Sequence, residues 1–215
     1  MQDEPAVLVR QGYDVVAQRY LAWAKPSPTR ARYLELLRQL LPAQGRILEI
    51  GCGAGVPVAR DLAAEAEVVG VDISATQIAL ARQAVHQATF IAADITQMDF
   101  PPATFDAVVS FYAILHIPRA LHAELFTSVA RWLRPGGVFV ASLGAQDSPD
   151  MVEADWLGVP MFFSHFDAAT TIALLRQAGL HLTHAEVVAE DEDGVAVPFL
   201  WVLAQHGGDA PYRPS

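Results

Sequence analysis

Three glycines at alternate positions follow a short apolar run, and together these features could hold a nucleotide. The run covers residues 46–50 and is typical of a buried strand, while Gly51, Gly53 and Gly55 would let a ligand lie against the backbone. A second apolar run, residues 68–71, ends in Asp72, whose carboxylate can accept hydrogen bonds from both hydroxyls of a ribose. The order strand, glycine loop, helix, strand and acid predicts a nucleotide-binding unit.

Two details disfavour a dinucleotide. The dinucleotide fingerprint G-x-G-x-x-G needs a small residue at the position that Val56 occupies here, and the third glycine comes one residue earlier. Glu49 sits at the end of the first predicted strand, where its carboxylate would repel a pyrophosphate. Because an acidic rim suits a cationic ligand better, an NAD-dependent oxidoreductase is an alternative that the sequence disfavours.

The E-x-G-x-G pattern at residues 49–53, followed by the strand-end acid, resembles the first two motifs of the class I S-adenosylmethionine-dependent methyltransferases, in particular small-molecule enzymes of types 11 and 25. Five segments carry the resemblance in order: LEIGCGAG, VVGVDIS, FIAADIT, FDAVVSFYAILHI and LRPGGVFVASLG. The resemblance runs from about Tyr13 to Gln205. It implies the cofactor S-adenosyl-L-methionine, a sulfonium that also carries an α-amino group.

The resemblance also implies a role for each residue around the cofactor. The three glycines would lie against its methionine portion, and Glu49 would contact its ammonium group directly or through water. Asp72 would bind the ribose, and Ile73 would pack on the adenine. The remaining residues would complete the site: Ala93 and Ile95 flanking the adenine, Asp94 accepting from its amino group, Phe111 near the reacting end, and Tyr20 at the carboxylate end.

Two histidines are candidates for catalysis. His116 follows the fourth predicted strand at the mouth of the expected site, where small-molecule methyltransferases often carry a base or a residue that orients the acceptor. Neutral imidazole could take a proton from a hydroxyl as the methyl group transfers. His165 lies in an aromatic segment, where it could line the acceptor pocket or anchor the segment. A structural role stays open for both histidines. A structural role is also expected for Asp106, which opens the fourth predicted strand. The spacing of His and acidic residues predicts no metal site.

The composition limits the partners. The chain has 215 residues, a formal net charge of −10 and one cysteine. Its scattered Lys and Arg residues disfavour nucleic acid and anionic membranes, because phosphate contacts need clustered cations. No apolar run is long enough to span a membrane, and one cysteine fits a reducing cytosol. We therefore expect a cytoplasmic protein that acts on a small molecule, with no indication of its oligomeric state.

The elements that would position these residues alternate between strand and helix. Helices at 6–24 and 28–41 would form an N-terminal cap over 6–42. Strands are then expected at 46–50, 67–71, 88–92, 105–110 and 138–142, and helices at 57–66, 74–87 and 118–133. A turn is expected at 134–137. Residues 144–167 show no clean period and predict an aromatic, lid-like loop. A helix at 168–178 and a hairpin of strands 181–190 and 196–204 follow.

This order predicts an α/β fold, a doubly wound seven-stranded Rossmann-like sheet whose last strand is antiparallel, with the N-terminal helical cap. Residues 1–206 would form a single methyltransferase domain, and residues 207–215 a flexible tail. We expect S-adenosylmethionine-dependent methylation of an oxygen or nitrogen on a small molecule. A non-catalytic S-adenosylmethionine-binding module is the other alternative.

Overall fold

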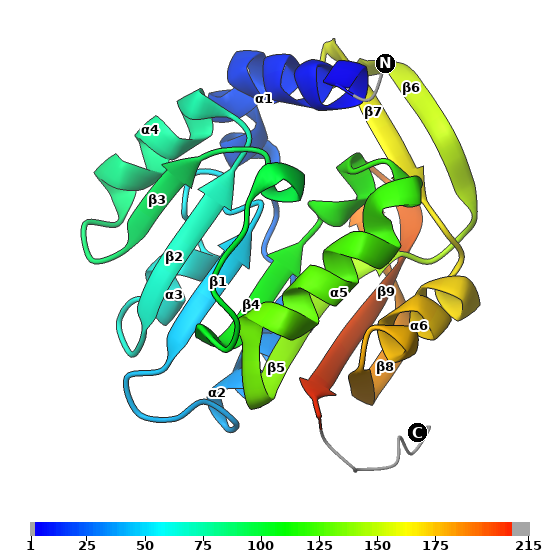
Figure 1. Cartoon of the computed structure of the whole chain (residues 1–215). Coiled ribbons are helices and arrows are strands. Elements are labelled where there is room, and N and C mark those ends of the chain that lie inside the picture. The colour runs from blue at the N-terminus through cyan, green and yellow to red at the C-terminus, as the bar shows by residue number, and fades with distance from the viewer. Residues whose placement is uncertain (1–2, 208–215) are drawn as a thin grey trace.

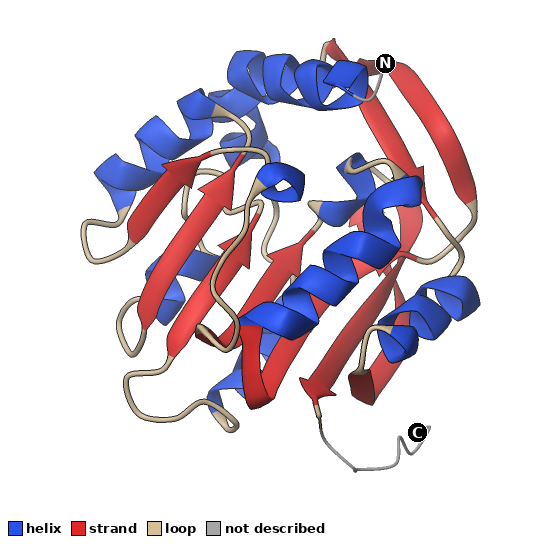
Figure 2. Cartoon of the chain, viewed as in Figure 1, coloured by secondary structure: helices blue, strands red, loops and turns tan. Residues whose placement is uncertain are grey.

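The computed structural model describes residues 3–207, in which helices lie on both faces of a central sheet (Figures 1 and 2). The elements in chain order are α1 (Asp3–Trp23), α2 (Pro28–Arg38), β1 (Arg46–Ile50), α3 (Val58–Leu62), β2 (Glu67–Asp72), α4 (Ala75–Ala84), β3 (Thr89–Ala92), β4 (Phe105–Phe111), α5 (His122–Trp132), β5 (Leu133–Gly144), β6 (Ser148–Trp156), β7 (Val159–His165), α6 (Ala168–Gln177), β8 (Leu180–Glu192) and β9 (Val195–His206). Short 3-10 helices cover Ile95–Gln97, Ile114–His116 and Arg119–Leu121. In this described part, no helix is both long and apolar enough to cross a membrane.

Seven strands form one sheet in the order β3-β2-β1-β4-β5-β9-β8. β1 pairs in parallel with β2 and β4, whereas β9 runs antiparallel to both of its neighbours, β5 and β8. The last strand of the chain is therefore the reversed one, which confirms the predicted doubly wound sheet. The chain order changes direction between β1 and β4, and ligands of such sheets bind beside that point, at the carboxyl ends of the strands.

Each face of the sheet is covered by its own layer of helices (Figure 2). α5 and α6 cover one face, where Phe126, Trp132 and Phe139 are fully buried. α2, α3 and α4 cover the other, where Tyr33 and Trp201 are fully buried. The central strands are apolar on both sides because helices exclude water from both. α1 belongs to neither layer and crosses above the carboxyl ends of β1 to β4 (Figure 1).

Two serine caps fix the first turns of α2 and α4. The Ser27 hydroxyl accepts a hydrogen bond from the Arg30 N–H at 3.0 Å, and the Ser74 hydroxyl accepts one from the Gln77 N–H at 3.1 Å. Such caps satisfy N–H groups that the helix itself leaves without an acceptor. The caps also position Arg30 and Gln77, which lie in these first turns, near the carboxyl ends of the strands.

Residues 144–167 differ from the irregular loop that the sequence predicts. Here β6 and β7 pair as an antiparallel hairpin, which forms a separate two-stranded sheet. The register shifts twice along the pair, so the side chains do not alternate strictly between two faces, and the sequence shows no period of two. Met161 and Phe162 of β7 pack with Val9 of α1. The hairpin is thus joined to the N-terminal cap by an apolar contact.

Some boundaries also differ from the prediction. Residues 134–137, predicted as a turn, belong to β5, and the predicted helix 118–133 is divided into a 3-10 turn and α5. β8 and β9 are longer than predicted because their pairing continues beyond the core as far as Glu192 and Val195. The predicted tail, 207–215, lies outside the described residues apart from Gly207.

Asp106 should stabilise the fold without serving the site. Its carboxylate, at the amino end of β4, accepts a hydrogen bond from the Arg46 N–H at 2.7 Å and pairs with Arg134 at 2.6 Å. Asp106→Ala should lower the free energy of unfolding by about 1–3 kcal/mol, because a partly buried N–H loses its acceptor. Urea unfolding measures this loss, and calorimetry with S-adenosylhomocysteine should show unchanged affinity. Weaker binding at unchanged stability would contradict the structural role.

Candidate active site

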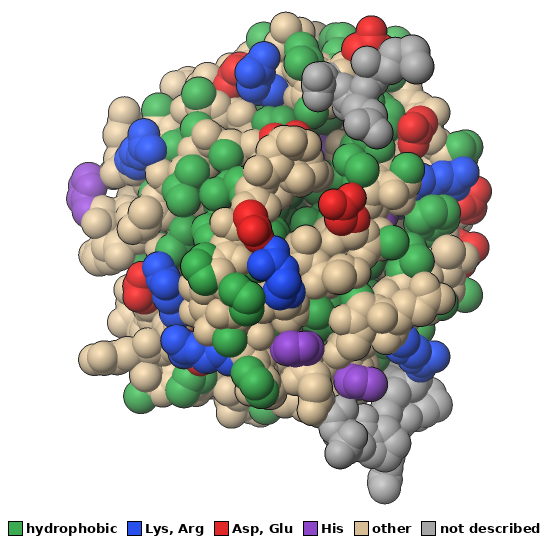
Figure 3. Space-filling view, in the orientation of Figure 1, with side chains coloured by type: hydrophobic (Ala, Val, Ile, Leu, Met, Phe, Trp, Pro, Cys, Tyr) green, Lys and Arg blue, Asp and Glu red, His purple; other side chains and the backbone are tan. Residues whose placement is uncertain are grey.

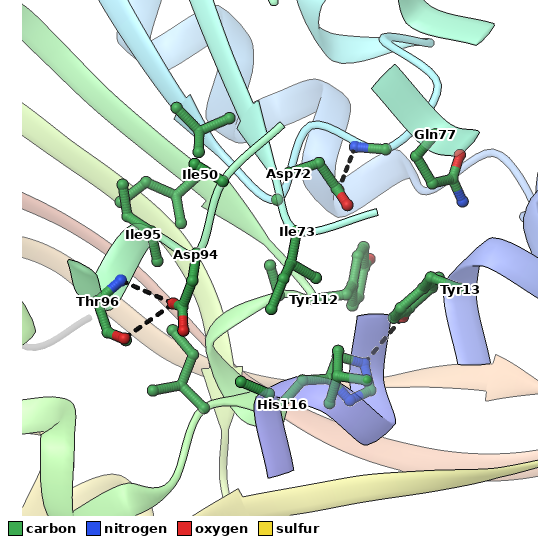
Figure 4. A pocket seen from close by; sticks show the side chains of 18 of the residues that line it. Tyr13, Ile50, Asp72, Ile73, Gln77, Asp94, Ile95, Thr96, Tyr112 and His116 are labelled. Carbon is green, nitrogen blue, oxygen red and sulfur yellow. Dashed lines mark hydrogen bonds between the residues drawn. The ribbon is translucent and has the colours of Figure 1, made fainter. Parts of the chain in front are cut away.

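A cavity of about 250 Å³ lies at the carboxyl ends of β1 to β4, beneath α1 (Figure 4). It brings together most of the residues that the sequence predicts for the site: Tyr20, Gly51, Gly53, Asp72, Ile73, Ala93, Asp94, Ile95, Phe111 and His116. Glu49, Gly55 and His165 do not border it. The predicted cofactor residues, which come from four strand ends, therefore converge on one space.

The three glycines of the loop after β1 have different tasks. All have positive φ, 71° at Gly51, 52° at Gly53 and 73° at Gly55, a conformation that favours glycine. A Cβ at Gly51 would lie 2.1 Å from the Ala113 Cβ, whereas one at Gly53 would meet only the Gln77 Oε1, at 3.9 Å. Gly53 thus leaves open space on the cavity side. Gly55 faces the packed interior against α4 and does not border this cavity, so its expected contact with the cofactor stays a prediction.

Asp72 is held at the end of β2 by two backbone donors. Its Oδ2 accepts a hydrogen bond from the Gly53 N–H at 2.8 Å, and its Oδ1 accepts one from the Ser74 N–H at 2.9 Å. Each oxygen keeps a further lone pair for a ligand hydroxyl. Burial raises the pKa of Asp72 to about 6, although the two N–H donors oppose that rise. The two hydrogen bonds therefore hold the carboxyl group in one orientation at the end of β2.

Glu49 lies behind the cavity wall as a buried carboxyl group. Only 5% of the residue is exposed, and its Oε2 has no hydrogen-bond partner among the described residues. Burial raises the pKa of Glu49 well above its ordinary value, and the charge of Asp72 raises it further, while Arg30 opposes the rise. A buried carboxylate without a partner costs free energy, and this cost favours the protonated carboxyl group unless a cation binds beside it.

Gln77 is a site residue that the sequence reasoning missed. It borders the cavity from the first turn of α4, it is 1% exposed, and neither its amide oxygen nor its amide nitrogen has a partner among the described residues. A buried amide without hydrogen bonds is destabilising unless a ligand supplies them. The available signal was its place three residues after the Ser74 cap, on the turn that follows Asp72.

Asp94 and its neighbours form the other side of the cavity (Figure 4). The Asp94 Oδ1 accepts hydrogen bonds from the Thr96 N–H at 2.9 Å and the Thr96 hydroxyl at 2.8 Å, and so caps a 3-10 turn. Its Oδ2 is left for a ligand. Three apolar side chains lie nearby and give this side the character expected for an adenine pocket: Ile50, Ile73 and Ile95.

His116 is buried at the junction of the loop after β4 with α1 and β7. Its Nδ1 lies 2.8 Å from the Phe162 carbonyl oxygen, and its Nε2 lies 2.9 Å from the Tyr13 hydroxyl (Figure 4). Because a carbonyl only accepts, Nδ1 carries the proton and Nε2 accepts from Tyr13. Burial lowers the pKa of His116 to about 4, so the ring is neutral at physiological pH.

A second cavity of about 220 Å³ adjoins the first. Tyr13, Tyr20, Tyr112 and His116 border both cavities. The second cavity is further lined by aromatic residues from α1, β6, β7 and β9: Trp23, Trp156, Phe163 and Phe199. Unlike His116, which borders both cavities, His165 borders only the second of them. The His165 Nδ1 is 2.6 Å from the Gln146 carbonyl oxygen. The two predicted catalytic histidines are therefore not equivalent.

Charge is scattered on the face of the molecule that Figure 3 shows, with Lys and Arg side chains interspersed among Asp and Glu. Within residues 3–207, no three His, Cys, Asp or Glu side chains come together in an arrangement that could hold a metal ion. The polar side chains that line the two cavities are acidic residues, three glutamines, two histidines, several tyrosines, a serine and a threonine, with Lys25 and Arg30 on the second cavity.

Comparison with known proteins agrees with this geometry. A family model described as a methyltransferase domain matches residues 47–137. A sterol 24-C-methyltransferase of Gibberella zeae is 30% identical over 177 residues, which cover 74% of this chain and 45% of that protein. The 27-O-demethylrifamycin SV methyltransferase of Amycolatopsis mediterranei is 32% identical over 173 residues, covering 74% of this chain and 63% of that enzyme. This chain thus spans less than two thirds of the length of either relative.

A solved methyltransferase structure has a similar fold. The crystal structure of a Burkholderia thailandensis 1,6-didemethyltoxoflavin-N1-methyltransferase with bound S-adenosylhomocysteine covers 97% of this chain with 91% of its own, at a TM-score of 0.74 and 21% identity. The matched domain, these relatives and the strand order together show that this chain has the fold of the class I S-adenosylmethionine-dependent methyltransferases and resembles members of that class in sequence.

Proposed function

We propose that this protein transfers a methyl group to an oxygen or nitrogen of a small organic molecule. The observation that carries the proposal is the buried Gln77 amide without partners at the cavity, beside the fixed carboxylate of Asp72, with the unpartnered Glu49 oxygen behind the cavity wall. A ligand with hydroxyl and ammonium donors would satisfy them. When bound, S-adenosylmethionine supplies a methyl group that its sulfonium makes reactive.

The residues present fit this cofactor. Asp72 would accept from the ribose hydroxyls, and Gln77 would complete the hydrogen bonds on the same side. Asp94 would accept from the adenine amino group through its free oxygen, with Ile73, Ala93 and Ile95 against the ring. Gly53 leaves the space that a side chain would fill. Phe111 lies on the first cavity at the end of β4, where the reacting end of the cofactor is expected.

The amino-acid end of the cofactor needs an anion and a cation. Glu49 would accept from the ammonium. Arg30 is close enough to Glu49 and Tyr20 to influence the pKa values of both, and its guanidinium makes no ion pair or hydrogen bond with another residue that the structure describes. Arg30, together with Tyr20, would therefore bind the carboxylate.

The second cavity would hold the acceptor, since it shares a wall with the first. The relatives named above are methyltransferases of a sterol, a rifamycin and a toxoflavin precursor, which supports a small organic acceptor. α1 and the β6–β7 hairpin would act as a lid that excludes water around the reacting groups. His116 would act as a base or position the acceptor, and His165 would line the far side of the acceptor cavity.

Calorimetry tests the cofactor, and S-adenosylhomocysteine release tests the transfer. S-adenosylmethionine and S-adenosylhomocysteine should bind, whereas NAD should not. Formation of S-adenosylhomocysteine in the presence of an acceptor would separate an enzyme from a non-catalytic binding module. Tight NAD binding without S-adenosylhomocysteine binding would overturn the proposal.

Asp72→Ala should weaken S-adenosylhomocysteine binding by about 1–3 kcal/mol, because ribose hydroxyls lose their acceptor. In the wild type, affinity should also fall as the pH drops below about 6, where the buried Asp72 carboxyl takes up a proton. The variant should lack this pH dependence. Asp99→Ala is the matched control, since Asp99 is a surface carboxylate paired with Arg131. Equal affinities in the Asp72 and Asp99 variants would argue against the ribose role.

Gln77→Leu should separate binding from stability. The change removes two buried polar atoms that lack partners in the ligand-free protein, so the free energy of unfolding should rise by about 1 kcal/mol. Binding of S-adenosylhomocysteine should weaken at the same time. Thermal unfolding with and without ligand measures both quantities. A variant that is less stable and binds as well as the wild type would show that Gln77 serves packing alone.

The free energy of unfolding should depend on pH because of His116. In the unfolded chain, His116 has the ordinary histidine pKa of about 6.5, whereas in the folded protein its pKa is about 4. As the pH falls, the unfolded chain therefore takes up a proton at a higher pH than the folded protein does. The stability of the wild type relative to His116→Gln should therefore fall by roughly 3 kcal/mol as the pH drops from 7 to 4. Urea unfolding of both proteins at each pH gives this difference. A constant difference would mean that the folded histidine titrates normally.

A further inference from the structure

His116 has no free lone pair with which to accept a hydrogen bond from the substrate that receives the methyl group. Its Nδ1–H donates to the Phe162 carbonyl at 2.8 Å, and the lone pair on Nε2 accepts from the Tyr13 hydroxyl at 2.9 Å. Burial raises the pKa of Tyr13 well above its ordinary value, so Tyr13 keeps the proton that it donates. Direct proton transfer from a substrate to His116 would first require Tyr13 to leave.

Tyr13 is itself placed to meet the acceptor. It borders both the cofactor cavity and the second cavity, and it points toward His116 across the space between α1 and the loop after β4 (Figure 4). A phenolic oxygen that donates its own proton can still accept a hydrogen bond. Of Tyr13 and His116, it is therefore the Tyr13 oxygen that can still accept a hydrogen bond from the substrate.

We propose, on the basis of the function proposed above, that Tyr13 takes the proton of the acceptor and passes its own proton to His116. The O–H bond of the acceptor breaks and its proton joins the Tyr13 oxygen, while the original Tyr13 O–H bond breaks and that proton joins Nε2. Tyr13 ends with the same number of protons, and His116 gains one. The positive charge that enters the site with the sulfonium ends on His116, so the charge of the site is unchanged by the step.

Burial disfavours a charge on His116, so the ring would hold the proton only transiently. The side chains packed against its ring are Tyr13 from α1, Trp156 from β6 and Phe163 from β7, with ring centroids 5.4, 6.1 and 4.8 Å away. Only Tyr13 among them is titratable, and no Lys or Arg ion pair lies on this ring to oppose the charge. The Phe162 carbonyl, 2.8 Å from Nδ1, would strengthen its hydrogen bond to the charged ring.

The acceptor that fits this relay is a phenol. Its hydroxyl can donate a hydrogen bond to Tyr13, and its proton becomes acidic as the oxygen forms its bond to the methyl group, so even a weak base such as His116 can receive it through the relay. Its ring would lie among the aromatic side chains of the second cavity, whose volume of about 220 Å³ suits a small planar molecule. Tyr20, Trp156 and Phe163 form that wall, with ring centroids 5.8 and 6.2 Å apart along it.

The test compares two acceptors in one variant. Tyr13→Phe keeps the ring and removes the relay oxygen. With 4-methoxyphenol, which is not ionised at neutral pH, its turnover should fall by about 10²–10⁴-fold relative to the wild type. With 4-nitrophenol, which is largely ionised already, the loss should be much smaller. An equal loss with both phenols would make Tyr13 a structural residue and overturn the relay.

A second readout does not depend on turnover. Nitrogen-15 NMR of the histidine-labelled protein with bound S-adenosylhomocysteine should show His116 protonated at Nδ1 and not at Nε2. In Tyr13→Phe the Nε2 resonance should move, because its hydrogen bond is lost, while Nδ1 stays protonated. A wild-type spectrum with Nε2 protonated would overturn the proposal, since Tyr13 could not then donate to it.

The outcomes separate the two levels of inference. If S-adenosylhomocysteine binds and neither phenol is methylated, the acceptor class is wrong and the cofactor assignment still stands. If S-adenosylhomocysteine does not bind, the proposed function itself fails, and the relay fails with it.

Discussion

The turn at Gly51 is the constraint on which the rest of the site depends. The backbone leaves β1 there with a positive φ of 71°, and the N–H groups of Gly51 and Cys52 both donate to the Val71 carbonyl at the end of β2, at 2.8 and 3.1 Å. The position of a missing Cβ is taken by Ala113, in the loop after β4. Three strand ends thus meet without a side chain between them. The floor of the cofactor cavity is made of backbone because this junction is so close.

The cavity is built from groups that are unstable in the absence of a ligand. Asp72 and Glu49 are both buried, and the charge of Asp72 raises the pKa of Glu49. Gln77 adds two buried polar atoms without partners. Each of these groups lowers the stability of the empty protein, and each becomes favourable when a ligand supplies hydroxyl or ammonium donors. Stability and binding therefore oppose one another at the same residues, as is common for functional sites.

The acceptor side is built differently, from elements outside the central sheet. α1 contributes Tyr13, Tyr20 and Trp23, and the β6–β7 hairpin contributes Trp156 and Phe163. These rings contact one another edge to face or at a tilt, for example Tyr13 against Tyr20 at 5.4 Å and against Trp156 at 5.5 Å. In the proposed function, the sheet that would bind the cofactor is thus separate from the cover that would select an acceptor. This division lets one fold serve many acceptors, so the fold does not identify the acceptor.

The sequence by itself determined the features that rest on neighbouring residues. Strand ends followed by glycine or acid, the Ser27 and Ser74 caps and the C-terminal hairpin are local signals, since each depends on the backbone preferences of a few adjacent residues. Only the tertiary structure decided what meets across the fold. Tyr13 and His116 are 103 residues apart, and His116 and Phe162 are 46 apart, so no local pattern indicates that both ring nitrogens are occupied. Gly55 turned to the interior and β6–β7 formed a hairpin for the same reason, because packing against distant elements outweighed the local signal.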